Sequence, residues 1–96
     1  GEDAGAIFQR IRADFAFFSS KCIAPDGNIY DSTMEEVLVK EAMLKNTAKK
    51  VFLCDSEKFD QYAGFRQCAL ANVDYMVSEI DCREKYQHLA PNVTFL

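Results

Sequence analysis

A carboxylate and an amine follow directly on a short apolar run within Lys49–Phe59, KKVFLCDSEKF. The apolar residues Val51–Leu53 lead into Asp55, and Lys58 comes three residues later. An aspartate accepts hydrogen bonds from two neighbouring hydroxyls, the arrangement that a sugar offers, and a lysine ammonium suits phosphate or another anionic oxygen. The pair therefore predicts contact with a polyhydroxylated, anionic small molecule. Two structural interpretations stay open beside it, in which Asp55 caps a turn and Lys58 makes a solvated ion pair.

Polar residues stand at two further places where an apolar segment ends. Ser19, Ser20 and Lys21 follow the aromatic run DFAFF, and Ser78 and Glu79 follow DYMV. Ligands of open α/β sheets bind beyond the carboxyl ends of the strands, so these residues mark the edge where a site would lie. Surface lysines are common, which gives Lys21 a purely structural explanation as well.

The spacing of apolar residues predicts the helices that position these groups. Asp3–Arg12 and about Thr33–Ala48 have helical periodicity, and Thr33 with Glu36 has the spacing of a capping box. The expected apolar face of the first helix comprises Ala4, Ile7, Phe8 and Ile11. That of the second comprises Val37, Leu38, Ala42, Met43 and Leu44.

Four strands and a last short helix complete the predicted order. The strands are Asp14–Phe18, Lys50–Cys54, Asp74–Ser78 and Asn92–Leu96, and the helix is Cys82–Leu89. Ser19–Asp31 has the residues of a loop with a turn at Pro25–Gly27, and Phe65–Ala71 carries no clear signal. Apolar strands that alternate with amphipathic helices predict an α/β fold, a three-layer, mostly parallel sheet with helices flanking both faces.

Composition narrows the possible functions. The chain has 96 residues, 49% of them hydrophobic, and a formal net charge of −4 without a long basic run, which argues against nucleic-acid or anionic-membrane binding by these residues themselves. No apolar run approaches the ~20 residues of a membrane span. The four scattered cysteines form no C-x-x-C pair, so we expect reduced thiols in a cytoplasmic protein and neither a metal nor a cofactor.

Taken in order, these blocks resemble the effector-sensing domain of DeoR-family transcription repressors. EEVLVKEAM, Glu35–Met43, is similar to the family's helix pattern E-E-A-E-V-K-x-x-M, and DSEKF, Asp55–Phe59, to its strand-end motif D-S-S-K-F. The upstream stretch from Arg12 to Glu36 and the third strand end, Ser78-Glu79, also follow the family's order, so the resemblance covers nearly the whole chain. Departures include Ser19 and Cys22 at usual glycines, Glu57 inside D-S-S-K-F, and Glu79 in place of an aspartate.

The resemblance implies a fold, a function and a set of partners. The fold is that of ribose-5-phosphate isomerase and CoA-transferase domains, and the function is binding of a phosphorylated sugar or related metabolite that controls DNA binding by a longer parent. The family's helix-turn-helix and the phosphate loop that opens its sensor domain do not appear in residues 1–96, so we expect a partial sensor domain that meets DNA only through its parent. The expected ligand contacts are Asp55 and Lys58, with Ser20, Lys21 and Asp31 as weaker candidates.

Three other functions were weighed against this one. A sugar-phosphate isomerase of the same fold would use Asp55 or Glu79 as its base. A phosphoacceptor receiver domain would need an acidic pair at the end of the first strand, where Ser19 and Ser20 stand instead. A scaffold without a ligand is the third. We expect no enzyme, and we expect self-association because a domain cut inside its sheet would expose a strand edge and apolar surface.

Overall fold

The structure is a computed structural model that describes residues 2–96, with side chains from Gly5 onward. Its helices are α1 (Glu2–Phe8), α2 (Met34–Lys45) and α3 (Arg83–Tyr86), with short 3₁₀ turns η1 (Ser56–Lys58), η2 (Leu70–Asn72) and η3 (Gln87–Leu89). Its strands are β1 (Ala13–Phe18), β2 (Cys22–Ile23), β3 (Asn28–Asp31), β4 (Thr47–Leu53), β5 (Phe65–Ala69), β6 (Tyr75–Val77) and β7 (Thr94–Phe95).

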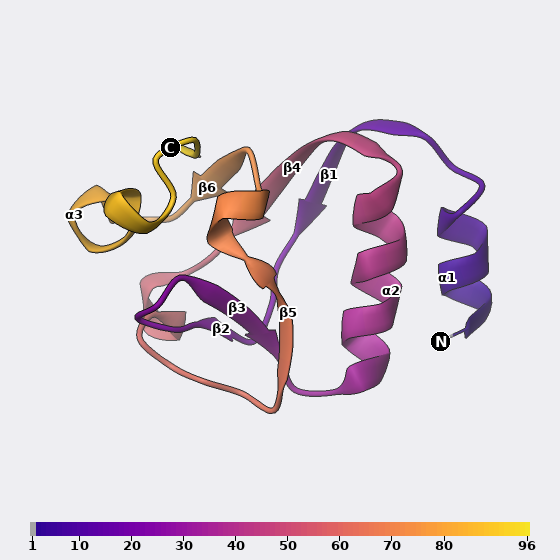
Figure 1. The fold of residues 1–96 in the computed structure, drawn as a ribbon, viewed down its shortest axis with the longest axis horizontal. Helices are drawn as coiled ribbons and strands as arrows, with labels where there is room; N and C mark the ends of the chain where they lie inside the picture. Colours follow the sequence, from indigo (N-terminus) through magenta and orange to yellow (C-terminus); the bar gives the residue numbers. More distant parts are fainter. Residues whose placement is uncertain (1) are drawn as a thin grey trace.

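A parallel sheet in the order β1-β4-β6-β7 forms the centre of the fold (Figure 1). β1 pairs with β4 from Ala13 opposite Thr47 to Phe18 opposite Phe52, and all three pairs of neighbouring strands are parallel. One face of this sheet is apolar and buried, with Phe18 and Met76 at most 4% exposed. The mostly parallel α/β sheet with flanking helices is therefore confirmed.

A second, antiparallel sheet in the order β2-β3-β5 packs beside the first. The prediction that Ser19–Asp31 is a loop is wrong, because β2 and β3 within this range form a hairpin. β5 then pairs with β3 as the third strand. The predicted turn within the hairpin is confirmed. Gly27 has a φ of 84°, which favours glycine, and the Asp26 carboxylate accepts hydrogen bonds from the Asn28 amide (3.0 Å) and side chain (3.1 Å).

Helix α2 begins as its sequence predicts. The Thr33 hydroxyl accepts a hydrogen bond from the Glu36 amide at 3.2 Å and donates one to the Glu36 carboxylate at 2.9 Å, which confirms the capping box. The helix buries Val37, Ala42 and Leu44, with Met43 half-buried. It ends at Lys45, earlier than expected, because β4 starts at Thr47.

Both long helices lie on the same side of the parallel sheet. Figure 1 shows α2 beside the sheet and α1 on the outer side of α2. The predicted apolar face of α1 is largely unburied, since Ile7 is 58% exposed and Phe8 only half-buried, while Ile11 lies beyond the end of the helix. The Ala4 side chain lies outside the described part. Leu38, predicted as inner, faces the hollow between the two helices and is 53% exposed.

The opposite face of the parallel sheet carries exposed aromatic residues. Phe15 and Phe17 stack with ring centroids 6.2 Å apart and are 52% and 62% exposed, and Leu53 on the neighbouring strand is 39% exposed. The expectation that helices flank both faces is therefore met on one face among residues 2–96. None of the helices in this range has both the length and the apolar character to cross a bilayer.

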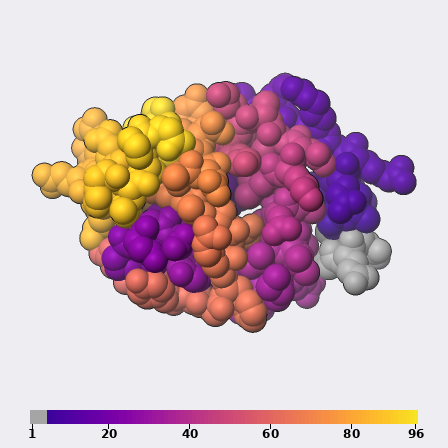
Figure 2. Space-filling model, viewed as in Figure 1, coloured from indigo at the N-terminus to yellow at the C-terminus, as the bar shows by residue number. Residues whose placement is uncertain are grey.

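The C-terminal segment closes the core at the far end of the sheet. Tyr86 and Ala90 have no exposed surface and belong to the same apolar cluster as Phe52 and Met76. Figure 2 shows this segment in yellow, packed against η2 and the hairpin turn. The predicted helix at Cys82–Leu89 appears as α3 followed by η3, and the predicted last strand appears as the shorter β7.

Candidate functional site

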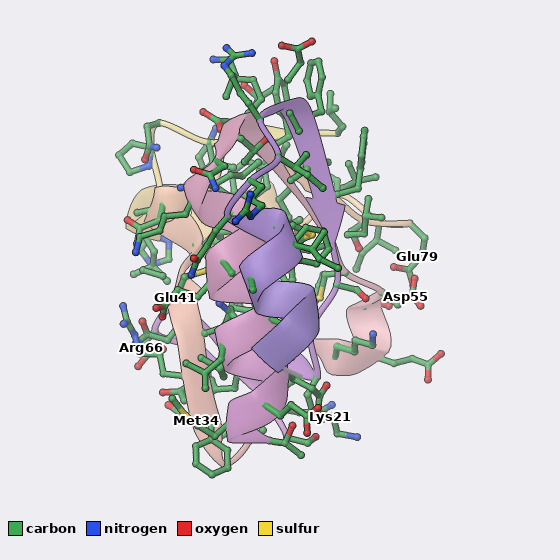
Figure 3. All side chains as sticks on the ribbon, turned by 90° about the vertical axis from the view of Figure 1, so that its right-hand side faces the viewer. Lys21, Met34, Glu41, Asp55, Arg66 and Glu79 are labelled. Carbon is green, nitrogen blue, oxygen red and sulfur yellow. The ribbon has the colours of Figure 1, made fainter. Side chains whose placement is uncertain are left out.

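Three parallel strands end at one edge of the sheet and bring the predicted polar residues together. β1 leads into Ser19, β4 into Asp55, and β6 into Ser78 and Glu79. These residues and Lys58 line a hollow of about 510 Å³. Figure 3 shows Asp55 and Glu79 close together, with Lys21 below them. These residues lie beyond the carboxyl ends of the strands, which is where open α/β sheets bind ligands.

Within residues 5–96, the Asp55 and Lys58 side chains take part in neither a helix cap nor an ion pair with each other. Asp55 is exposed and precedes η1, but its side chain makes no capping hydrogen bond to that turn. Lys58 is half-buried, and the described residues contain no ion pair between it and Asp55. The contacts that a cap or a solvated ion pair would require are therefore missing from the described residues. The Asp55 carboxylate, an oxygen acceptor, and the Lys58 ammonium line the same hollow.

The Glu79 carboxylate, in contrast, is engaged in hydrogen bonds within the protein. Its carboxylate accepts hydrogen bonds from the Ser56 hydroxyl (2.6 Å), the Ser56 amide (2.8 Å) and the Ser78 hydroxyl (2.9 Å). These donors, that of the Ser56 side chain foremost, lower the pKa of Glu79 to about 2. Glu79 therefore ties the end of β6 to η1 and stays ionised.

The loop from Asp55 to Gln61, which we call the ligand loop, is fixed to its neighbours on two sides. Phe59 forms a β-bridge with Ile23 of the hairpin, and the Gln61 amide donates to the Ile23 carbonyl at 3.1 Å. From the other side, the Tyr86 hydroxyl accepts from the amide of Asp60, whose carboxylate forms an ion pair with Lys85. Lys58 is thus held between the hairpin and the C-terminal segment.

A second hollow of about 470 Å³ adjoins the first. It is lined by Ser19, Ser20, Lys21, Ser32, Glu36, Lys40, Glu57, Lys58 and Gln61. Because Ser19 and Lys58 line both hollows, they form one continuous polar region. The structure therefore brings together four of the five predicted ligand residues, namely Ser20, Lys21, Asp55 and Lys58.

The fifth, Asp31, lies behind the second hollow. It has no exposed surface, and its carboxylate forms an ion pair with Lys40 at 2.7 Å. Lys40 also donates to the Ser20 hydroxyl at 3.4 Å. A ligand in the hollow would meet Lys40 in front of Asp31.

Among the polar residues of this region that the sequence analysis did not select, Lys40 is the one that forms an ion pair with a predicted residue, Asp31. Its signal is its phase on α2, since Lys40 follows the buried Val37 by three residues and precedes the buried Leu44 by four. A lysine inside the buried stripe of a helix needs a partner, and the partner, Asp31, lies in another element. The contact could not be read from spacing alone.

The cysteines are unsuited to nucleophilic chemistry. All four are free thiols, and burial raises the pKa of Cys54 to about 12 and that of Cys68 to about 11. Thiols with such pKa values are protonated and weakly nucleophilic at neutral pH. Among residues 5–96, whose side chains the structure describes, no three histidine, cysteine or acidic side chains are placed to hold a metal ion.

Two other hollows lie away from the strand ends. One of about 640 Å³ separates α1 from α2 and has largely apolar walls, such as Ala6, Leu38 and Ala42. The other, of about 200 Å³, lies between α2 and β5, where Figure 2 shows an opening. Neither gathers side chains from the ends of the parallel strands, so we place the candidate site at the ligand loop.

Comparison with known proteins identifies the class to which this fold and this edge belong. Residues 1–79 match the model of the DeoR C-terminal sensor domain, and the chain belongs to that family of regulatory sensor domains. The chain is also similar to the glycerol-3-phosphate regulon repressor of Haemophilus influenzae, with 29% identity over 76 residues. This alignment covers 79% of the chain and 30% of that repressor, so the chain spans about a third of the relative's length.

Proposed function

We propose that this domain binds a phosphorylated sugar or a related phosphorylated metabolite at the ligand loop. The observation that carries the proposal is the convergence of Asp55 and Lys58, neither engaged in a cap or an ion pair with the other, on one polar hollow at the strand ends. A carboxylate for hydroxyl groups and cations for anionic oxygens are the chemistry that such a ligand needs. Ser20 and Lys21 extend this region on the side of the hairpin.

The similarity to a glycerol-3-phosphate regulon repressor supports a small phosphorylated polyol as the ligand class. Asp55 would bind hydroxyl groups, and Lys58 an anionic or ring oxygen.

We further propose that the parent protein is a transcription repressor, of which residues 1–96 are part of the sensor domain. DNA would be bound by a segment outside this range, in line with the net charge of −4. A bound metabolite could control DNA binding only by preferring one arrangement of the parent over another.

Thermal unfolding of the full-length protein with and without sn-glycerol 3-phosphate and ribose 5-phosphate tests the proposal. A ligand that binds the native state raises the free energy of unfolding by mass action, by about 2.7 kcal/mol at a hundredfold excess over Kd. The melting temperature rises with it. Asp55→Ala should abolish that gain and leave the melting temperature of the free protein nearly unchanged, because the Asp55 side chain makes no cap.

Asp14→Ala is the matched control, since it removes another exposed carboxylate at the opposite end of β1. It should keep the response to the ligand. An Asp55→Ala protein that fails to fold would show that Asp55 is a structural cap, and a wild-type protein that responds to no phosphorylated metabolite would refute the proposed ligand class.

A further inference from the structure

Asp60, near the end of the ligand loop, has a backbone conformation that needs support. Its φ is 59°, and among the residues whose backbone the structure describes it is the non-glycine residue with a positive φ. Aspartate adopts this left-handed conformation more readily than most residues, but the conformation stays less favourable than the right-handed one. The chain turns here from η1 toward the hairpin, where the Gln61 amide donates to the Ile23 carbonyl at 3.1 Å. The contacts of Asp60 therefore decide the path of the ligand loop.

Two residues of α3 supply those contacts. The Tyr86 hydroxyl accepts a hydrogen bond from the Asp60 amide at 3.3 Å and lies 3.4 Å from the Asp60 carboxylate, to which it donates. The other carboxylate oxygen forms an ion pair with the Lys85 ammonium. The backbone and the side chain of Asp60 are thus both bound by one segment, 25 and 26 residues further along the chain.

The phenol that binds Asp60 is itself fixed. Tyr86 has no exposed surface and belongs to the apolar core cluster. Its ring packs edge-on against Phe59, with ring centroids 5.4 Å apart and an interplanar angle of 85°. Phe59 in turn forms the β-bridge with Ile23, which is also fully buried. Because side chains in a close-packed core have little room to move, the Tyr86 hydroxyl offers the ligand loop a fixed point.

Lys58 lies between this anchor and a second one. Before Lys58, the amide and the hydroxyl of Ser56 are bound by the Glu79 carboxylate. After Lys58, Asp60 is bound by α3. The turn between the anchors, η1, has three residues, and a single 3₁₀ turn has little stability of its own. The position of Lys58 at the hollow therefore depends on both anchors.

We propose that Asp60 and Tyr86 are positioning residues of the ligand site. They act through the ligand loop, because neither of them lines the hollows at the strand ends. The inference rests on the proposed function and adds the C-terminal segment to it. A metabolite that binds the ordered ligand loop also favours the packing of α3 against that loop, and by linkage the loss of this packing weakens metabolite binding by the same factor.

Affinity and stability, measured separately, distinguish a positioning role from a purely structural one. sn-Glycerol 3-phosphate and ribose 5-phosphate are titrated calorimetrically into the full-length protein, and urea unfolding gives the stability of the free protein. Tyr86→Phe keeps the buried ring and removes the hydroxyl, so it should weaken binding about 2- to 10-fold, the range expected for one hydrogen bond. Tyr62→Phe is the matched control, since it removes the hydroxyl of an exposed tyrosine just beyond the ligand loop, and it should bind like the wild type.

Three substitutions at Asp60 separate its backbone from its side chain. Asp60→Ala removes the carboxylate and disfavours the positive φ, so it should lose the most affinity. Asp60→Gly also lacks the carboxylate but adopts a φ of 59° readily, and it should recover part of the affinity. Asp60→Asn tolerates this φ and keeps an oxygen for the Tyr86 hydroxyl, so its affinity should come closest to that of the wild type. Asp60 is exposed, so these variants test the role even if Tyr86→Phe destabilises the core.

Hydrogen exchange reports on the coupling directly. Mass spectrometry of the full-length protein measures amide exchange in peptides that cover the ligand loop and α3, with and without sn-glycerol 3-phosphate. The metabolite should slow exchange in both peptides of the wild type. In Tyr86→Phe, saturated with the metabolite, the protection of α3 should be reduced, because the hydroxyl that joins α3 to Asp60 is absent.

Two results would overturn the inference, and they differ in what they imply for the proposed function. If Tyr86→Phe and Asp60→Ala lose stability but bind with wild-type affinity, while Asp55→Ala does not bind, the positioning role is wrong and the proposed function stands. If neither sn-glycerol 3-phosphate nor ribose 5-phosphate binds the wild type, both proposals fail.

Discussion

Asp55 and Glu79 follow neighbouring parallel strands, and Figure 3 shows them close together, yet their surroundings give them different properties. Three donors bind the Glu79 carboxylate, whereas the Asp55 side chain makes no capping bond. A carboxylate that is already saturated with donors positions the backbone around it. One that has no such donors is available to a ligand.

This difference bears on the isomerase alternative. A general base works best when its pKa lies near the working pH, and the pKa of Glu79 is lowered to about 2 by the Ser56 and Ser78 hydrogen bonds. We therefore expect no conversion of ribose 5-phosphate to its ketose, measured by proton exchange at C2 in NMR spectra of the full-length protein. Isomerisation of ribose 5-phosphate that is lost in Glu79→Gln or Asp55→Ala would contradict this expectation and show that the protein is an enzyme.

The same contacts of Glu79 predict an acid dependence of stability. Because the pKa of Glu79 is lower in the folded protein than in the unfolded chain, its contribution is present above about pH 4.5 and is lost as the pH falls toward about 2. Glu79→Gln should therefore lower the free energy of unfolding near neutral pH and flatten its slope between these values, as measured by urea titration at a series of pH values. Glu84→Gln, at an exposed carboxylate of α3, is the control and should keep the wild-type slope. An equal slope in Glu79→Gln would mean that the serine contacts do not form in solution.

At the scale of the element, α2 carries both its start signal and a site residue. The Thr33 hydroxyl caps the first turn, and Lys40 projects from the second. Thr33→Ala should cost about 0.5–2 kcal/mol of unfolding free energy, because the Glu36 amide loses its partner. Thr33→Ser keeps the hydroxyl and should cost much less. Chemical denaturation monitored by circular dichroism measures both, and equal stability of Thr33→Ala and the wild type would contradict the cap.

The elements that sequence predicted well are those with a local signal. The apolar run at Val51–Leu53 and the period of α2 each lie within one stretch of chain, and both appear in the structure. The hairpin of β2 and β3 was missed because its strands have two and four residues, too short for an alternating pattern to show. β5 carried no clear signal because its order comes from pairing with β3, some 38 residues earlier.

The site was predictable to a similar extent. Asp55 and Lys58 could be selected because they follow an apolar strand directly. Lys40 could not, because its distinguishing contact with Asp31 exists only once β3 and α2 have packed. The state of Glu79, likewise, depends on Ser56, which lies 23 residues away in the chain.

At the scale of the whole molecule, the uncovered face of the parallel sheet is the main irregularity. Phe15, Phe17 and Leu53 lie on it and are 39–62% exposed. β1 is also an edge strand, with one side unpaired in the described sheet. Exposed apolar surface and open strand edges favour association with another chain.

We therefore expect the 96-residue chain to be a dimer or higher oligomer at micromolar concentration, as measured by sedimentation equilibrium. Phe17→Lys should shift it toward monomer. Leu38→Lys is the matched control, since Leu38 is also about half exposed but lies on α2 at the other side of the molecule. A compact monomeric wild type would show that the sheet needs no partner on this face.

The region that matches the family ends at residue 79, but the structure does not divide there. Residues 80–96 supply β7 to the parallel sheet and bury Cys82, Tyr86 and Val93 in the core. They also hold Asp60 of the ligand loop through Tyr86 and Lys85. The part of the chain beyond the family match thus belongs to the same folded unit and supports the site.

Tyr86, which binds the backbone amide of Asp60, also affects the ultraviolet spectrum of the protein. The chain contains no tryptophan, so tyrosine dominates its ultraviolet absorption and emission above 270 nm or so. Tyr86 is fully buried, and burial raises the pKa of its phenol, so its phenolate forms at a higher pH than that of an exposed tyrosine. Its ring packs edge-on against Phe59, one residue from Lys58. Tyr86, one of the four tyrosines of the chain, therefore contributes an absorption and emission that depend on its packing against the ligand loop.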